Sequence, residues 1–242
     1  MKNDTIKHYI IDSRKRTSGV SHNFTLEFRD SIKYANKTSL QLVSIPVTYY
    51  NVKDGYNKIN FNEGGPELIA TLDSGNYSIA DLLVEIKAKM EAVGALTYTV
   101  TYSNITMKLT ISASGSFELL YGTGSNPTDQ LRTLLGYDAV DTGSATSHVS
   151  NDVVRLSNPR FIKIRIREFG ISGKFSDDES FTFIINVEEN RGAYNNNKLG
   201  EYYQQCTISC DTITDIQVQL FDEDNNLLDM NGGEWYAVLK IQ

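Results

Sequence analysis

The chain has 242 residues, 40% of them hydrophobic and 22% charged, which is enough to bury a large core, and all-β sandwiches of this length commonly form one domain. Its net charge of −7 argues against a surface that wraps nucleic acid, because neutralising phosphates requires a basic footprint. No run approaches the roughly 20 apolar residues of a membrane helix, and the first residues lack the apolar stretch of a secretory signal. We therefore expect no membrane span, no specific nucleic-acid partner and a reducing compartment.

The earliest strand signals come soon after the N-terminus. Phe24, Leu26 and Phe28 alternate with polar residues, a spacing that predicts a strand with one buried face. A second apolar strand follows and stops at Pro46. Because the first residues are locally basic, we predict an N-terminal arm over residues 1–20, either solvated or facing a partner.

The segment after Ser78 departs from the strand pattern. Its apolar residues recur every three or four positions up to Gly94, which is typical of an amphipathic helix. Ser78 and Asp81 resemble a capping box, and Gly94 is well placed to end the helix. We expect a second, shorter helix that starts at Pro127 and ends at Gly136.

Period-two alternation dominates the rest of the chain. It occurs at residues 98–102, 107–111, 162–166, 181–187, 214–220 and 235–241. The first two of these segments are separated by a short turn and predict a hairpin. Strands do not alternate regularly with helices, which disfavours a parallel doubly wound sheet. We predict an all-β sandwich in one domain over residues 21–242, with residues 78–150 as an insertion region that carries the helix and the hairpin.

Residues capable of catalysis or metal binding are sparse. No serine lies in a Gly-x-Ser-x-Gly elbow, and His8, His22 and His148 show no ligand-like spacing. Cys206 and Cys210 would lie about 13 Å apart on one strand at ~3.3 Å per residue, whereas a disulfide needs a Cα separation below about 7 Å. We therefore expect no catalytic residue, metal or cofactor, and an enzyme is the less favoured alternative.

Two charged segments allow two interpretations each. The acidic run at residues 222–226 could hold calcium, but an EF-hand loop needs Gly at its sixth and Glu at its twelfth position, where the chain has Leu227 and Gly233. A tight turn is therefore preferred. The basic row of Lys163, Arg165 and Arg167 would face either solvent or an acidic neighbour.

Several aromatic residues also allow two interpretations, a binding surface or packing in a core or subunit contact. They could build a surface for sugar or protein, although core or subunit packing is the default because tyrosine is an ordinary strand residue. The residues considered are Tyr49, Tyr50, Tyr202, Tyr203 and Trp235.

Several short motifs follow one another along the chain. They read Ile-Asp-Ser-Arg, Phe-x-Leu-x-Phe, Ile-Pro-x-x-Tyr, Gly-Asn-Tyr-Ser, Leu-Leu-Gly-Tyr and, near the end, Leu-Phe-Asp-Glu-Asp and Leu-Asp-Met-Asn-Gly. In this order they resemble the minor capsid, or penton, proteins of virophages, Polinton-like viruses and some large DNA viruses. The resemblance covers nearly the whole chain. The residues that carry it, to which we assign structural roles, are Asp12, Ser13, Arg14, Phe24, Pro46, Tyr49, Gly75, Tyr77, Leu82, Gly136, Asp222 and Gly232.

The resemblance implies a single jelly roll, with two facing antiparallel sheets. It also implies a homopentamer that closes each five-fold vertex of an icosahedral capsid, next to major capsid protein neighbours and with a spike or fibre as a further candidate partner. The protein would be made in the cytoplasm or virus factory of an infected cell and end in the virion. The alternatives are a trimeric receptor-binding or spike head, a major capsid subunit and a non-catalytic jelly-roll binding module. A cupin-type enzyme would need a histidine-rich metal cluster.

Overall fold

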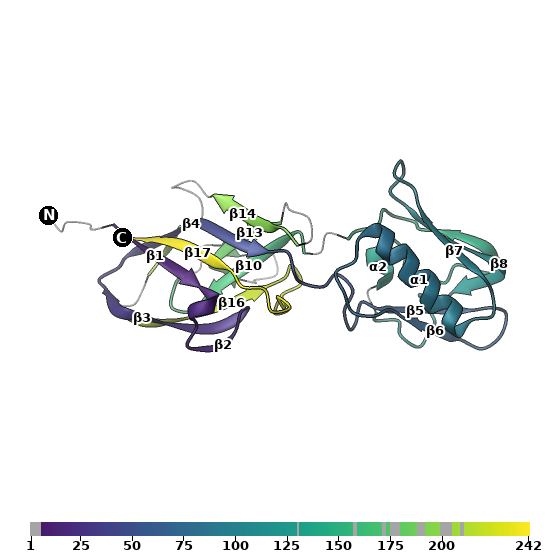
Figure 1. Cartoon of the computed structure of the whole chain (residues 1–242), viewed down its shortest axis with the longest axis horizontal. Coiled ribbons are helices and arrows are strands. Elements are labelled where there is room, and N and C mark those ends of the chain that lie inside the picture. Colours follow the sequence, from purple (N-terminus) through teal and green to yellow (C-terminus); the bar gives the residue numbers. More distant parts are fainter. Residues whose placement is uncertain are drawn as a thin grey trace. The chain divides into compact units, whose positions relative to one another are not determined.

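The computed structural model describes residues 6–129, 131–156, 159–170, 173–174, 180–187, 192–198, 205–208 and 211–242. The chain forms two compact units, one of Met1–Tyr49 with Asn158–Gln242 and one of Tyr50–Ser157. Each unit has its own cluster of buried hydrophobic side chains. Figure 1 shows the strands of both units.

The first sheet of unit 1 is antiparallel and has the order β1-β17-β4-β14, with β15 also paired to β4. Its strands are β1 (Lys7–Asp12), β4 (Lys37–Pro46), β14 (Tyr194–Lys198), β15 (Gln205–Thr207) and β17 (Tyr236–Ile241). A single 3-10 turn, η1 (Ser13–Lys15), follows β1.

The second sheet of unit 1 has the order β13-β10-β16-β3-β2, again antiparallel. Its strands are β2 (Ser18–Val20), β3 (Asn23–Lys33), β10 (Phe161–Ile166), β13 (Phe183–Asn186) and β16 (Thr212–Phe221), and β11 (Gly173–Lys174) pairs separately with β12 (Ser180–Phe181). As the chain passes from β1 to β3, β4 and β10, it switches between the two sheets as in a jelly roll.

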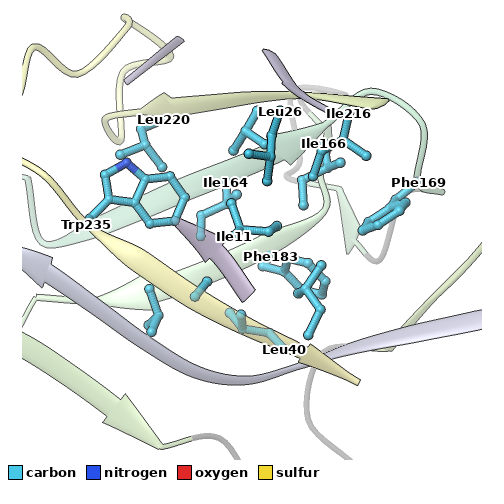
Figure 2. Close-up of a cluster of buried hydrophobic side chains, with 14 of the residues drawn as sticks. Ile11, Leu26, Leu40, Ile164, Ile166, Phe169, Phe183, Ile216, Leu220 and Trp235 are labelled. Atoms are coloured by element: carbon cyan, nitrogen blue, oxygen red, sulfur yellow. The ribbon is translucent and has the colours of Figure 1, made fainter. Parts of the chain in front are cut away.

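The core of unit 1 lies between these two sheets. Alternate residues of each strand point inward, so Ile11 and Leu40 from the first sheet share one cluster with Leu26, Ile164 and other residues of the second (Figure 2). The predicted strands at residues 24–28, 162–166 and 235–241 are confirmed. The alternation shifts in β16, where an irregularity between Ile213 and Asp215 leaves Thr214 exposed.

Unit 2 has a smaller antiparallel sheet of order β6-β5-β8-β7, with β9 also paired to β8. Its elements are β5 (Lys58–Asn62), β6 (Leu68–Thr71), α1 (Ile79–Val93), β7 (Tyr98–Tyr102), β8 (Leu109–Leu119), α2 (Leu131–Leu135) and β9 (Ala145–Val149). The β7–β8 pairing confirms the predicted hairpin.

Helix α1 also matches the prediction. Its N-cap Ser78 accepts a hydrogen bond from the Asp81 amide, and its C-cap Gly94 donates its amide to Met90. The buried face carries Leu82, Ile86 and Met90. The second helix is shorter than expected, because it begins at Leu131 rather than Pro127.

The structure differs from the predicted domain plan in two respects. The insertion spans Tyr50–Ser157 rather than residues 78–150, and it is a compact unit with a separate core. The described part of the first 20 residues is no free arm, because β1 pairs with β17 and buries Ile11, and β2 pairs with β3. The physical reason is that the inward side chain of Ile11 adds apolar area to the core.

No helix among the described residues is long and apolar enough to cross a membrane.

Candidate functional site: a pocket on the outer face of a jelly-roll sheet

Four polar side chains form a row across the first sheet of unit 1. The strand register places Asp12 opposite Tyr236, Tyr236 opposite Ser44, and Ser44 opposite Asn196. Because facing residues of neighbouring strands lie on the same face, these side chains share the face opposite the core. The Ser44 hydroxyl donates to Asn196 Oδ1 at 2.6 Å.

The 3-10 turn after β1 is fixed to the segment that precedes β17. The Ser13 amide donates to the Trp235 carbonyl at 2.9 Å, and the Trp235 amide donates to Ser13 Oγ at 2.9 Å. The Ser13 hydroxyl in turn donates to the carboxylate of Glu234. The Trp235 indole Nε1–H donates to the Ser21 carbonyl at 2.6 Å, so both ends of the 13–21 turn are held by one residue.

Arg16 neutralises Glu234. Its Nη1 donates to Glu234 Oε1 at 2.8 Å and Oε2 at 2.9 Å, and also to the Ser13 carbonyl at 2.6 Å. Partial burial acts to raise the pKa of Glu234, but the hydrogen bonds from Ser13 and Arg16 outweigh it, so the pKa lies below its ordinary value. Glu234 is therefore a carboxylate at neutral pH.

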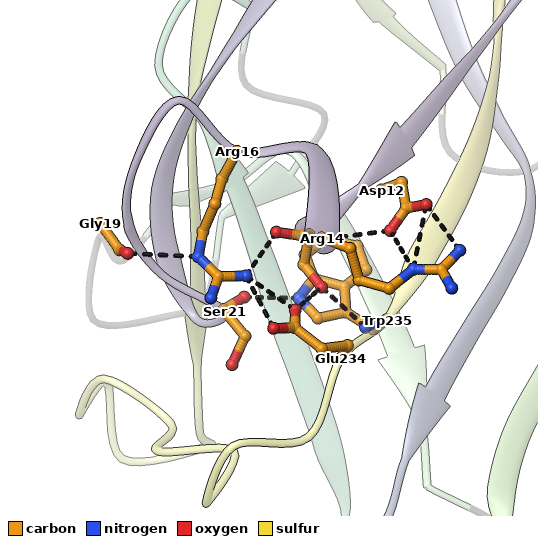
Figure 3. Close-up of polar contacts among 8 residues, drawn as sticks. Asp12, Arg14, Arg16, Gly19, Ser21, Glu234 and Trp235 are labelled. Atoms are coloured by element: carbon orange, nitrogen blue, oxygen red, sulfur yellow. Dashed lines mark hydrogen bonds and ion pairs between the residues drawn. The ribbon is translucent and has the colours of Figure 1, made fainter.

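Arg14 and Asp12 form the second ion pair of the site. Arg14 Nε donates to Asp12 Oδ1 at 3.0 Å, and Nη2 donates to Oδ2 at 2.8 Å, which is a fork-like geometry (Figure 3). These hydrogen bonds lower the pKa of Asp12 and raise that of Arg14. The Arg14 side chain is 68% exposed.

A pocket of about 390 Å³ opens between these groups. Its lining residues come from β1, β4, β14, β17 and the flanking turns, and they are Asp12, Arg14, Ser44, Tyr194, Asn196, Glu234, Trp235 and Tyr236. Tyr194 is 52% and Tyr236 38% exposed, so both rings present aromatic surface at the outer face. The pocket can accept and donate hydrogen bonds beside two aromatic rings.

The predicted signature residues divide between the two units. Asp12 and Arg14 line the pocket, and Ser13 supports it. Phe24 packs edge-on against the Trp235 ring with centroids 5.9 Å apart. The other signature residues lie away from the pocket.

In unit 1, Pro46 ends β4 and Tyr49 is buried, which raises its pKa above the ordinary value. Asp222 begins the acidic turn, and Gly232 lies in the turn before Glu234. The buried indole of Trp235 and the buried ring of Tyr49 are core residues, as the default interpretation held.

The remaining signature residues organise unit 2. The amide of Gly75 donates to the Val52 carbonyl at 2.9 Å, and the Tyr77 amide donates to Asn51 Oδ1 at 2.9 Å. Leu82 lies on the buried face of α1 and belongs to the core of unit 2. Gly136 has a positive φ of 83°, and a Cβ added there would lie 2.3 Å from the Asp152 carbonyl oxygen, so only glycine fits.

Two of the three side chains in the basic row of β10 contact groups of their own unit. Lys163 is 2% exposed, and its ammonium donates to the Glu223 carbonyl at 3.3 Å. Arg165 lies over the Phe221 ring at 4.5 Å from the centroid, while Arg167 is exposed.

The acidic run at residues 222–226 forms a turn, which is the interpretation preferred over a calcium site. The Asp222 amide donates to the Asn226 carbonyl, and the Asn226 amide donates back to Asp222 Oδ1 at 2.8 Å. Arg160 pairs with Glu223 at 2.7 Å.

Other potential reactive groups remain apart. Within the described residues, no group of three or more His, Cys, Asp or Glu is placed to hold a metal. Cys206 is a free thiol whose pKa is raised to about 12 by burial, and Cys210 lies outside the described residues. The same holds for Tyr202 and Tyr203.

Sequence reasoning did not find several residues of the pocket. Tyr194, Asn196, Ser44 and Glu234 belong to no motif, and their convergence depends on strand register. Tyr236 could have been found, because it is the first outward position of a strand whose inward positions were identified.

No protein-family model matches the chain, and no curated protein matches it significantly. Among solved structures, the chain is similar to the mavirus penton protein, with a TM-score of 0.55 and 10% sequence identity over 98% of each chain. The fold is penton-like. At this identity the likeness concerns the fold alone.

Proposed function

We propose that the chain is a structural capsid protein that forms homopentamers at the five-fold vertices of an icosahedral virus shell. It would be a component of the virion rather than an enzyme, and its neighbours in the shell would be major capsid proteins. The observation that supports this proposal is the likeness to the mavirus penton protein, which extends over 98% of both chains and so includes both units.

The sandwich of unit 1 suits a subunit of a closed ring. Its two sheets share a continuous core, and the Trp235 indole next to β17 of the first sheet donates to the Ser21 carbonyl between β2 and β3 of the second. In a ring of identical copies, one side of a subunit meets a different side of the next, and a fixed rotation closes the ring. Such contacts would also cover the outer edges of strands β1 and β2, which each pair with one neighbour in the described sheets.

Native mass spectrometry of the purified full chain across a concentration series tests this proposal, followed by particle images of each assembly. A closed ring of five subunits is the expected result. A trimer would favour the receptor-binding or spike head, and a chain that stays monomeric at high concentration would count against a self-assembling vertex protein.

A further inference from the structure

We propose that the pocket between β1, β17, β4 and β14 binds a neutral pyranose sugar. This site goes beyond the proposed capsid role and does not depend on it. The proposal depends on the pocket's charge balance, its aromatic rings and its unused hydrogen-bonding groups, all within unit 1.

The charges around the pocket cancel. Asp12 is paired with Arg14 at 2.8 Å, and Glu234 is paired with Arg16 at 2.8 Å. Two carboxylates therefore face two guanidinium groups at hydrogen-bond distance. A ligand with a net charge would be attracted by one member of each pair and repelled by the other, so an uncharged ligand fits better.

The polar groups that remain available can both donate and accept. The hydroxyls of Tyr194 and Tyr236 and the Nη1 of Arg14 make no hydrogen bond within the described residues, and ionised carboxylates retain further lone pairs beyond those already used. A sugar hydroxyl is a donor and an acceptor at once. Neighbouring hydroxyls on a pyranose ring match such a mixed set, whereas a hydrocarbon ligand would leave these groups without partners.

The aromatic rings supply the apolar part of the site. Tyr194 and Tyr236 are 52% and 38% exposed on the solvent side of the sheet, so part of each ring is accessible to a ligand. A pyranose presents C–H groups on one face and hydroxyls at its rim, so it can pack against a tyrosine ring while its hydroxyls reach the polar groups. The volume of about 390 Å³ lies within the usual size range of small-molecule pockets, which is about 300–1,000 Å³.

The position on the face of the sheet argues against a peptide strand as the ligand. The pocket lies on the outward face of the sheet near the ends of four paired strands, where side chains rather than backbone groups form its lining. Added strands bind at exposed sheet edges, where backbone groups are free. A ligand here must therefore be recognised by side chains, as a small sugar can be.

Binding is measured by saturation-transfer NMR, because the Trp235 indole is 2% exposed and packs against Phe24 in the core, so its fluorescence does not report directly on the pocket. Glucose, galactose and mannose are titrated against the full chain while saturation transfer to the sugar protons is recorded, and the methyl glycosides of the same sugars and glucuronic acid are titrated in parallel. Free hexoses represent soluble sugars, and methyl glycosides represent the terminal sugar of a glycan. The expected result is a saturable transfer signal for at least one of the neutral sugars, with a dissociation constant in the millimolar range. A ligand that binds only as the glycoside identifies a glycan terminus, and one that binds only as the free hexose identifies a soluble sugar.

Two variants test the location of binding. Tyr194→Ala removes one aromatic wall from the solvent side and should weaken binding about tenfold. Tyr236→Phe keeps the ring and removes only the hydroxyl, so it should weaken binding less while preserving the fold. Tyr34→Ala is the matched control, because Tyr34 is a 74% exposed tyrosine of the same unit that does not line the pocket. Circular dichroism confirms that each variant is folded.

Three results would overturn the proposal. They are no saturation transfer to any neutral sugar, undiminished transfer in Tyr194→Ala, and transfer confined to glucuronic acid. The result is independent of the ring-forming test, since a chain that forms pentamers without binding sugar retains the capsid role and loses this site. A chain that binds sugar without forming pentamers retains this site and loses the support for the capsid role.

Discussion

Ser13 and Trp235 are separated by 222 positions in the chain, and two backbone-anchored hydrogen bonds of 2.9 Å join them. One runs from the Ser13 amide to the Trp235 carbonyl, and the other from the Trp235 amide to Ser13 Oγ. Both residues are buried, so water cannot replace these bonds. The pair connects the end of the first strand with the start of the last.

Replacing Ser13 with alanine should destabilise unit 1. The Trp235 amide would lose its partner in a buried position, and Glu234 would lose one donor, so we expect a loss of about 1–3 kcal/mol. Urea unfolding followed by Trp235 fluorescence measures the change. Ser18→Ala is the control, because Ser18 is exposed on β2. Equal midpoints for wild type and Ser13→Ala would contradict the prediction.

The charge of Glu234 should make stability depend on pH. Its pKa is lowered in the folded state, so the unfolded chain takes up this proton more readily. The resulting stabilisation is complete above the unfolded pKa of about 4.3 and is lost as pH falls through the lower folded pKa. Glu234→Gln should therefore have a lower Tm than wild type at pH 7, and the gap should narrow toward pH 3.

Calorimetry between pH 3 and pH 7 measures the difference in Tm between wild type and Glu234→Gln. Glu27→Gln, which alters an exposed carboxylate on β3, should stay close to wild type at neutral pH. A gap between wild type and Glu234→Gln that is constant over the whole range would show that the charge of Glu234 contributes nothing.

Reversing the charge of Lys163 should strongly destabilise unit 1. Its side chain is 2% exposed beside the acidic turn, so Lys163→Glu would bury a carboxylate without a cation, at a cost of about 3–5 kcal/mol. Arg167→Glu makes the same reversal at an exposed position of the same row and should cost far less. Chemical denaturation measures the free energy of unfolding of both variants. A similar loss of stability in Lys163→Glu and Arg167→Glu would mean that Lys163 is not buried in solution.

Comparing alanine substitutions at Gly136 and Gly143 distinguishes the cost of backbone strain from the cost of a steric clash. Both have positive φ, at 83° and 71°, but a Cβ would meet the Asp152 carbonyl at 2.3 Å only at Gly136, with nothing within 4 Å at Gly143. Gly143→Ala should cost about 1 kcal/mol from strain. Gly136→Ala should cost clearly more, because the backbone of residue 152 must also move. Thermal melts of both variants measure the difference, and equal Tm values would refute it.

A fragment of residues 50–157 should fold without the rest of the chain. Its core is formed from its own residues, and its helix and sheet contact one another. We expect a cooperative thermal transition and dispersed amide resonances for the isolated fragment. A disordered spectrum would show that unit 2 requires unit 1.

Most of the secondary structure follows from local signals in the amino-acid sequence. Alternation at Phe24, Leu26 and Phe28 identified one strand, and the Ser78 cap and Gly94 stop identified α1, because these signals are local and follow from the periods of strands and helices. The expected sandwich and penton-like fold agree with the structure.

The division into two units and the formation of the pocket depend on long-range packing, which local sequence signals do not reveal. Period-two alternation shows that a strand has a buried face but not which core that face joins, so Leu109 and Ile164 looked alike although they lie in different units. Burial of Lys163 likewise depends on a turn 60 positions later in the chain. Asp12, Ser44, Asn196 and Tyr236 meet only because strand register aligns four distant segments, and register is set by the packing of the whole sheet.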